Sequence, residues 1–250
     1  MVAKKSQKSQ VIILILVLTN LVQVIFLMII SFHFNVPQRI FFRLGIIEGK
    51  LYEGTLIDRN LRNFNERIAL FAVYFPKDYR IVMLGDSITA GVEWNELLGI
   101  TSIANRGISG DTTNGFNERL FSVYSVNPEI CFIMGGINDI RRGVEAESIL
   151  TNIRRTVLKL YGMGIKPILQ STLHVSNERH YWETVNRIVD ELNNGMKEFS
   201  MKKGLLFLDV NAVLSDGYSL RKEYTFDGLH LTGSGYKRWG KLLLELLETL

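Results

Sequence analysis

Cysteine and histidine are scarce in this sequence. Its 250 residues contain one cysteine, Cys131, and four histidines. A single cysteine excludes an intrachain disulfide and any metal site built from several thiolates. Cys131 lies inside the apolar run 130–134, where a thiol is typically a small buried hydrophobic group rather than a reactive one.

The sequence also lacks a basic surface with interleaved aromatic residues, internal repeats and low-complexity segments. Its formal net charge is +4, and three of the positive charges are Lys4, Lys5 and Lys8. The remaining charges nearly balance, so a nucleic-acid partner is not expected. Apolar side chains are abundant, at 47% of the residues, which is ample for a buried core. The length fits one main domain with an appendage.

The N-terminal part contains a long stretch without charge. No charged residue occurs between Lys8 and Arg39. Twenty helical residues with a rise of ~1.5 Å each span roughly 30 Å, the thickness of a bilayer core. The bulky residues 29–34 do not fit a signal-peptide cleavage site, so the pattern predicts an uncleaved transmembrane anchor over 11–34. A buried helix of a soluble domain is the alternative.

The region after the anchor is expected to connect it to the main domain. Phe64, Ile68 and Phe71 recur at helical spacing, which predicts a helix over 56–75 that Pro76 ends. The expected segments are a basic tail over 1–10, the anchor over 11–34, a juxtamembrane connector over 35–76 and the main domain over 77–250.

Strand and helix patterns alternate from residue 79 onward. Short apolar runs predict strands over 81–84, 102–104, 130–134, 167–170 and 205–208. Apolar residues at helical spacing predict helices over 89–98, 113–124, 146–161, 178–200 and 235–247. This alternation predicts an α/β fold, with a parallel sheet of about five strands between two layers of helices. Such sheets form their sites beyond the carboxyl ends of the strands.

Polar groups follow these strands. Gly85, Asp86 and Ser87 come after the first strand, where a tight turn leads into a helix. The free N–H groups at a helix start can stabilise an oxyanion, so a serine there can act as a nucleophile. The alternative is that Ser87 only caps the helix. Three further stretches of this kind are 105–111, 135–139 and 227–230.

These four stretches, in this order, resemble the four blocks of the SGNH (GDSL) hydrolase family, over about residues 81–241. The sequence Asn-Arg-Gly-Ile-Ser-Gly-Asp-Thr resembles the corresponding block of the acetylhydrolase branch of that family. The resemblance implies a Ser-His-Asp mechanism in which Ser87 is the nucleophile, His230 the general base and Asp227 the acid that orients it. It also implies an oxyanion hole formed by the N–H groups of Ser87 and Gly107 and the side-chain amide of Asn138.

Other polar residues are expected to have supporting roles. Asp86 and Asp139 are expected to bind backbone N–H groups of their own loops, and His174 to line the pocket. Gly107 as a turn residue and Asn138 as a loop cap remain the structural alternatives to their catalytic roles.

The resulting hypothesis is a membrane-anchored serine esterase that acts on small carboxylic esters, O-acetyl esters above all, without a cofactor or metal. Its substrate would be an acetylated sugar or a lipid. The alternatives are a lysophospholipase or thioesterase of the same family and an enzyme that transfers acyl groups to a cell-envelope sugar. A metal-dependent phosphoesterase and a non-enzymatic binding protein are further alternatives from other classes.

The basic tail before the anchor predicts the topology. Positive charges favour the cytoplasmic side, so residues 51–250 are expected outside the cytoplasmic membrane. Protease added to cells with a permeabilised outer layer and an intact inner membrane should therefore digest the domain. Complete protection that is lost only on lysis would reverse this orientation.

Overall fold

The computed structural model describes residues 59–74 and 78–250. The predicted anchor at 11–34 lies outside these residues, as do the tail and most of the connector. Among the helices in the two described ranges, none combines the length and apolar composition needed to cross a membrane.

Five parallel strands form one sheet with the order β2-β1-β3-β4-β5. All five predicted strands are confirmed, with small shifts at their ends. The strands are β1 (Ile81–Gly85), β2 (Ile103–Gly107), β3 (Ile130–Met134), β4 (Lys166–Gln170) and β5 (Leu206–Leu208). Every residue of β1 and β3 is buried, as expected of central strands that are covered on both faces.

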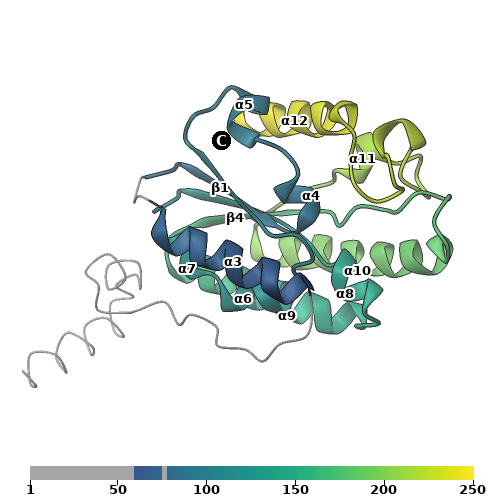
Figure 1. The fold of residues 1–250 in the computed structure, drawn as a ribbon, viewed down its shortest axis with the longest axis horizontal. Helices are drawn as coiled ribbons and strands as arrows, with labels where there is room; N and C mark the ends of the chain where they lie inside the picture. Colours follow the sequence, from purple (N-terminus) through teal and green to yellow (C-terminus); the bar gives the residue numbers. More distant parts are fainter. Residues whose placement is uncertain (1–58, 75–77) are drawn as a thin grey trace, which may run out of the picture.

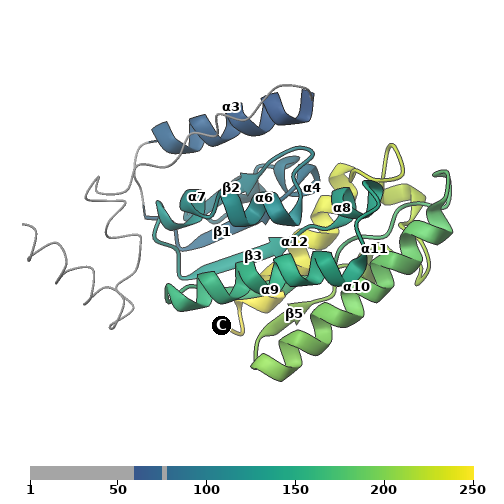
Figure 2. The same cartoon turned by 90° about the horizontal axis from the view of Figure 1, so that it is seen from below.

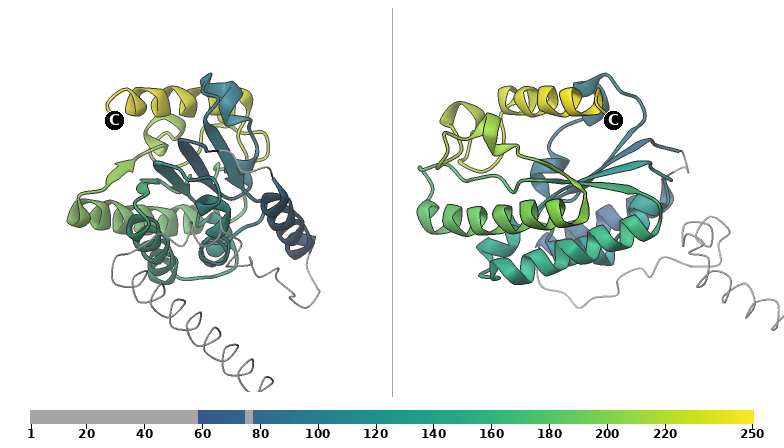
Figure 3. Two further views of the ribbon diagram at one scale, coloured as in Figure 1. Left: turned by 90° about the vertical axis from the view of Figure 1, so that its left-hand side faces the viewer. Right: turned by 180° about the vertical axis from the view of Figure 1, so that it is seen from behind.

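Helices cover both faces of the sheet (Figure 1). One layer contains α5 (Trp94–Leu98) and α12 (Gly233–Leu247), with α11 (Asn211–Leu214) beside α12. The opposite layer contains α6 (Thr113–Glu118), α7 (Phe121–Tyr124), α9 (Ala146–Gly162) and α10 (Trp182–Lys203). Figure 3 shows the two layers on either side of the sheet. The predicted three-layer arrangement is confirmed.

The helix α3 (Arg59–Val73) lies beyond the β2 edge of the sheet, alongside α7 (Figure 2). Its apolar side chains Phe64, Ile68 and Phe71 pack on Ile108 and Phe121. This cluster is separate from the main core, so α3 is attached to the domain through a small contact of its own.

Several helices differ from the sequence prediction. The stretch 89–98 is two helices, because α4 (Ser87–Ala90) ends at Gly91 and α5 starts after a turn. The stretch 113–124 is also broken, at Arg119, whose φ of −113° is not helical. The helix α10 starts at Trp182 rather than at 178, after a residue with φ of 58°. The short helices α8 (Ile137–Arg141), α11 and η1 (Lys222–Tyr224) were not predicted.

Candidate active site

Ser87 is the first residue of α4, and only Asp86 separates it from the end of β1. The helix packs closely on the strand ends because two glycines lie side by side there, Gly85 on β1 and Gly107 on β2. A Cβ atom on Gly85 would collide with Thr89, and one on Gly107 would lie 2.3 Å from the backbone nitrogen of Ala90. Glycine is therefore required at both positions, and it fixes Ser87 at the carboxyl edge of the sheet.

Ser87, His230 and Asp227 form a continuous chain of hydrogen bonds. The Ser87 Oγ atom lies 3.0 Å from His230 Nε2, and His230 Nδ1 lies 2.7 Å from Asp227 Oδ2. The other Asp227 oxygen accepts the backbone N–H groups of Leu229 and His230. Partial burial opposes the charged carboxylate, but these hydrogen bonds outweigh it and lower the pKa of Asp227. An ionised Asp227 holds the ring proton on Nδ1, which leaves Nε2 free to accept the serine proton.

Hydrogen bonds from the segment after β4 hold the loop that carries Asp227 and His230. Arg179 Nη1 donates to the Asp227 carbonyl oxygen at 2.8 Å, and the Ser176 N–H donates to the Gly228 carbonyl oxygen at 2.8 Å. Gly228 has φ of 81°, and the Arg179 stem lies where a Cβ atom would be. The segment after β4 therefore positions the Asp227–His230 pair.

The oxyanion side differs from the sequence expectation at one residue. The N–H of Gly107 already donates to Asn105 Oδ1 at 2.8 Å, inside the edge of the sheet. Three residues later, Gly110 has φ of 78°, and within residues 59–74 and 78–250 its N–H donates no hydrogen bond. Asn138 lies next to it, because its Nδ2 donates to the Asp111 carbonyl oxygen at 2.9 Å. An amide has two N–H groups, so the second remains available to a substrate.

Asn105 was missed as a supporting residue. Its Nδ2 donates to the carbonyl oxygens of Thr89 and Val92, and its Oδ1 accepts from Gly107. All the hydrogen-bonding positions on its nitrogen are used, and they tie the end of α4 to β2. The signal in the sequence was an asparagine directly after the predicted strand 102–104. In the structure Asn105 is the middle residue of β2, where β propensity disfavours asparagine.

A buried ionic network lies close to Ser87. Arg119 is completely buried, and its Nε donates to Asp111 Oδ2 at 2.6 Å while its Nη2 donates to the Gly85 carbonyl oxygen at 2.9 Å. Asp139 accepts the N–H and the hydroxyl of Thr113. Arg119 thus joins the end of β1 to the loop after β2, next to the residues that surround Ser87.

Asp86 is expected from the sequence to bind a backbone N–H, and its Oδ1 accepts the N–H of Ile88 at 2.9 Å. Its Oδ2 is buried without a partner among the described residues. Burial raises the pKa of Asp86 to about 7, and the nearby Asp111 and Asp139 carboxyls add to this rise. A protonated carboxyl thus occupies the start of α4 below neutral pH.

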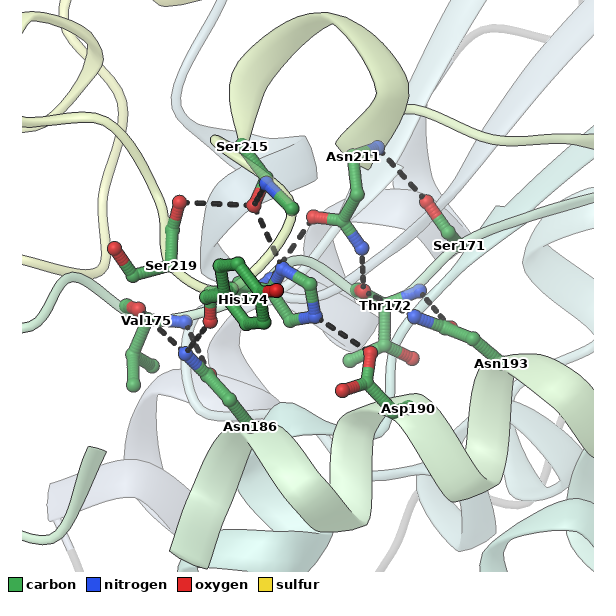
Figure 4. Close-up of polar contacts among 12 residues, drawn as sticks. Ser171, Thr172, His174, Val175, Asn186, Asp190, Asn193, Asn211, Ser215 and Ser219 are labelled. Carbon is green, nitrogen blue, oxygen red and sulfur yellow. Dashed lines mark hydrogen bonds and ion pairs between the residues drawn. The ribbon is translucent and has the colours of Figure 1, made fainter. Parts of the chain in front are cut away.

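His174 lies in a second polar cluster (Figure 4). Its Nδ1 is 2.8 Å from Ser215 Oγ and its Nε2 is 2.7 Å from Asp190 Oδ1. It lines a cavity of about 450 Å³ that neither Ser87 nor His230 lines. His174 is therefore not part of the Ser87 site, contrary to its expected position.

Ser215 is not a second nucleophile, although its neighbours are a histidine and an aspartate. Its hydroxyl donates to the Ser219 carbonyl oxygen at 2.8 Å and accepts the Gly217 N–H at 3.1 Å. With the His174 contact, every hydrogen-bonding position of this oxygen is used, and the residue is buried. The cluster is a structural clamp between α10 and the 215–219 loop (Figure 4).

The titration of Asp86 predicts a pH-dependent stability. The carboxyl has a pKa of 3.8 when unperturbed and of about 7 in the folded chain. Between these values the folded state holds a proton that the unfolded state has lost, so the free energy of unfolding falls as pH rises. Asp86→Asn should abolish this decrease in the free energy of unfolding, which is on the order of a few kcal/mol. Urea unfolding should show a larger gain for the variant at about pH 8 than at about pH 5.

Glu191→Gln, an exposed acid-to-amide change on α10, is the control and should show no such difference between the two pH values. An equal Asp86→Asn effect at both pH values would mean that Asp86 does not titrate in this range.

Two curated proteins illustrate what the chain is similar to. It is 28% identical over 159 residues to the N-acylneuraminate cytidylyltransferase of Streptococcus agalactiae serotype V, which is 63% of this chain and 36% of that protein. The chain thus spans about a third of that relative. It is also 28% identical over 187 residues to the platelet-activating factor acetylhydrolase IB subunit alpha2 of Rattus norvegicus, covering 70% of this chain and 78% of that protein.

The fold is shared with a solved GDSL-like lipase from Bacteroides thetaiotaomicron, with a TM-score of 0.66 at 23% identity. The superposition covers 75% of this chain and 98% of that one. The model of the GDSL-like Lipase/Acylhydrolase family matches residues 83–238, which include all four polar stretches. The chain therefore belongs to the GDSL-like lipase/acylhydrolase family.

Proposed function

We propose that the chain hydrolyses small carboxylic esters, O-acetyl esters first, through Ser87, His230 and Asp227. The single observation that carries the proposal is the chain of short contacts from Ser87 Oγ through the His230 ring to the Asp227 carboxylate. Geometry of this kind is what a hydroxyl nucleophile, a general base and an orienting acid require.

The reaction has two steps. Ser87 Oγ attacks the ester carbonyl carbon while its proton moves to His230 Nε2, and Asp227 stabilises the imidazolium. The tetrahedral oxyanion accepts hydrogen bonds from the N–H of Ser87, the N–H of Gly110 and the Asn138 amide. The alcohol leaves with the proton from Nε2. Water then attacks the acyl-enzyme and gives a proton to Nε2. Nε2 returns that proton to Ser87 Oγ as the bond between the acyl carbon and Oγ breaks and the acid leaves.

Asn138 is the donor whose removal is simplest to interpret. Loss of one oxyanion-hole donor typically costs about 3–4 kcal/mol in the transition state. Gly110 replaces Gly107 in this proposal because the Gly107 N–H is already bonded to Asn105.

Several alternatives use the same site or part of it. A lysophospholipase or thioesterase would differ in the acyl group, and an acyltransferase would replace water by a sugar hydroxyl. In the described residues, no three His, Cys, Asp or Glu side chains are grouped to hold a metal ion. A metal-dependent phosphoesterase would lose activity in chelator and regain it with a divalent ion, whereas the serine mechanism is insensitive to both.

The location of the domain is a further part of the proposal. An anchor at residues 11–34 would hold the enzyme at the membrane, with the domain outside the cytoplasm. This arrangement would place acetylated sugars of the cell envelope within reach of Ser87.

Ser87→Ala should abolish ester hydrolysis without unfolding the domain, because the small, partly buried side chain has no packing role that alanine cannot fill. A serine-reactive fluorophosphonate should label the wild type and not the variant. Ser215→Ala, which removes the other histidine-bonded serine, should still be labelled. Labelling that persists in Ser87→Ala would place the nucleophile elsewhere.

The acyl preference is expected to favour short chains. No long apolar segment is inserted between the catalytic stretches, so nothing resembles a lid that would shelter a long acyl chain. The similarity to an acetylhydrolase also favours a preference for short acyl chains. For p-nitrophenyl esters, kcat/KM should fall about tenfold or more from acetyl to octanoyl, or at least ~1.4 kcal/mol in the transition state. A rate that rises with chain length would favour a lipid substrate.

A further inference from the structure

A large groove lies between α3 and the open edge of β2, and none of Ser87, Asp227 and His230 lines it. Its volume is about 1000 Å³. Its lining includes all five residues of β2 and, from α3, Asn63 and Arg67. Because α3 lies outside the 83–238 stretch that matches the family model, this chain adds the α3 part of the lining to the hydrolase domain.

Arg106 is a buried cation at this groove. Only 4% of the residue is exposed. Its Nε donates to the Ser122 carbonyl oxygen at 2.9 Å and its Nη1 donates to the Asn105 carbonyl oxygen at 3.0 Å. Its guanidinium also lies 4.8 Å from the centre of the Phe71 ring. Both of these acceptors are neutral, so the positive charge is solvated by dipoles and a ring face rather than by a carboxylate.

A second cation lies beside it. The Arg67 guanidinium is 5.0 Å from the centre of the same Phe71 ring and also lines the groove. Burial, and more weakly the neighbouring Arg119 and Arg67 charges, lower the pKa of Arg106 to about 10, so it remains protonated at neutral pH. Two cations are therefore held at one aromatic ring, and both line the groove.

The charge of this pair is not balanced locally. In the described part of the chain, neither Arg67 nor Arg106 forms an ion pair, whereas Arg80, Arg119 and Arg154 each pair with a carboxylate. Among the described residues that line the groove, Glu93 is the only acidic one. An unpaired buried charge is costly, and a bound anion would offset that cost.

The remaining lining offers neutral hydrogen-bond donors. They are the side-chain amides of Asn63 and Asn95 and the hydroxyls of Tyr74, Thr101 and Ser109. Guanidinium groups bind the oxygens of phosphates in a bidentate way, and neutral donors complete such sites.

We propose that the groove between α3 and β2 binds a phosphate-bearing ligand through Arg67 and Arg106. Two guanidinium groups match the charge of a phosphate better than that of a single carboxylate. The phosphate comes from a soluble phosphate ester or from the headgroup of an anionic lipid, and both present the same oxyanion to the arginines.

The test uses the full chain in neutral detergent micelles. Line broadening in ³¹P NMR is measured for inorganic phosphate, for glycerol phosphate and, separately, for phosphatidylglycerol dissolved in the same micelles. Broadening by the wild type is expected in at least one of these. Broadening of the lipid signal alone identifies a headgroup, and broadening of the soluble signals alone identifies a soluble ester.

Arg67→Gln should weaken the affinity about tenfold or more, because Arg67 supplies one of the two cations and is not part of the core. Arg80→Gln is the matched control, since Arg80 is an exposed arginine that does not line the groove, and its variant should bind within about twofold of wild type. Glu93→Gln should strengthen binding, because it removes the only acidic lining residue. Arg106→Lys should weaken it in a chain whose circular dichroism is unchanged.

The absence of broadening in all three arms would overturn the proposal. So would equal losses for Arg67→Gln and Arg80→Gln, which would indicate a general charge effect. Hydrolysis of p-nitrophenyl acetate by Arg67→Gln should stay within about twofold of wild type. This readout separates a failure of the groove proposal from a failure of the proposed esterase activity.

Discussion

The ion pair between Arg119 and Asp111 is the contact on which the surroundings of Ser87 depend. Both side chains are buried, and the nitrogen and oxygen are 2.6 Å apart. The guanidinium also holds the Gly85 carbonyl oxygen, and the Asp111 carbonyl oxygen holds Asn138. Removing one partner of a buried pair typically costs about 3–5 kcal/mol because the other charge is left unpaired. One pair thus fixes both the strand end before Ser87 and the loop that contains Gly110 and contacts Asn138.

Burial separates the roles of the carboxyls around the site. Asp227 is partly exposed and accepts three hydrogen bonds, so its pKa is lowered and it stays ionised beside His230. Asp86 is buried with one oxygen unpaired, and its pKa is raised to about 7. A carboxylate that stays charged can orient an imidazole and stabilise an imidazolium, whereas Asp86 serves to start a helix. Two aspartates in one site therefore differ in function because their surroundings differ.

Strand positions and the order of the polar stretches were predictable because they depend on local pattern. Buried parallel strands are short apolar runs, and the family resemblance depends on residues that are close in sequence. The breaks in the helices were not predictable in this way. Arg119 leaves the helical conformation, and its guanidinium binds Asp111 and the Gly85 carbonyl, while Gly91 ends α4 before α5 can continue it. These contacts join distant segments, so a periodicity of apolar residues contains no sign of them.

The choice between Gly107 and Gly110 could not be predicted from the sequence either, because it depends on a single hydrogen bond. Both glycines lie in the same stretch, and either could approach a substrate oxygen on steric grounds. Gly107 ends β2, and its N–H points to Asn105, whose amide nitrogen bonds α4. Gly110 lies beyond the strand with a positive φ and an N–H that no described residue uses. A backbone N–H can bind a substrate oxygen only where no other group of the protein already accepts its hydrogen bond.

The two histidine clusters show that a serine beside a histidine and an aspartate need not be reactive. Ser87 and Ser215 each lie about 3 Å from one nitrogen of an imidazole whose other nitrogen is paired to an aspartate, so residue type alone does not separate them. The hydroxyl proton of Ser215 is bound by a carbonyl oxygen, and a backbone N–H occupies one of its lone pairs. Deprotonation by His174 would first have to break that bond between two buried residues, Ser215 and Ser219. Ser87 lies at a helix start where its only described side-chain partner is His230, so among the described side chains only His230 Nε2 is placed to accept its proton.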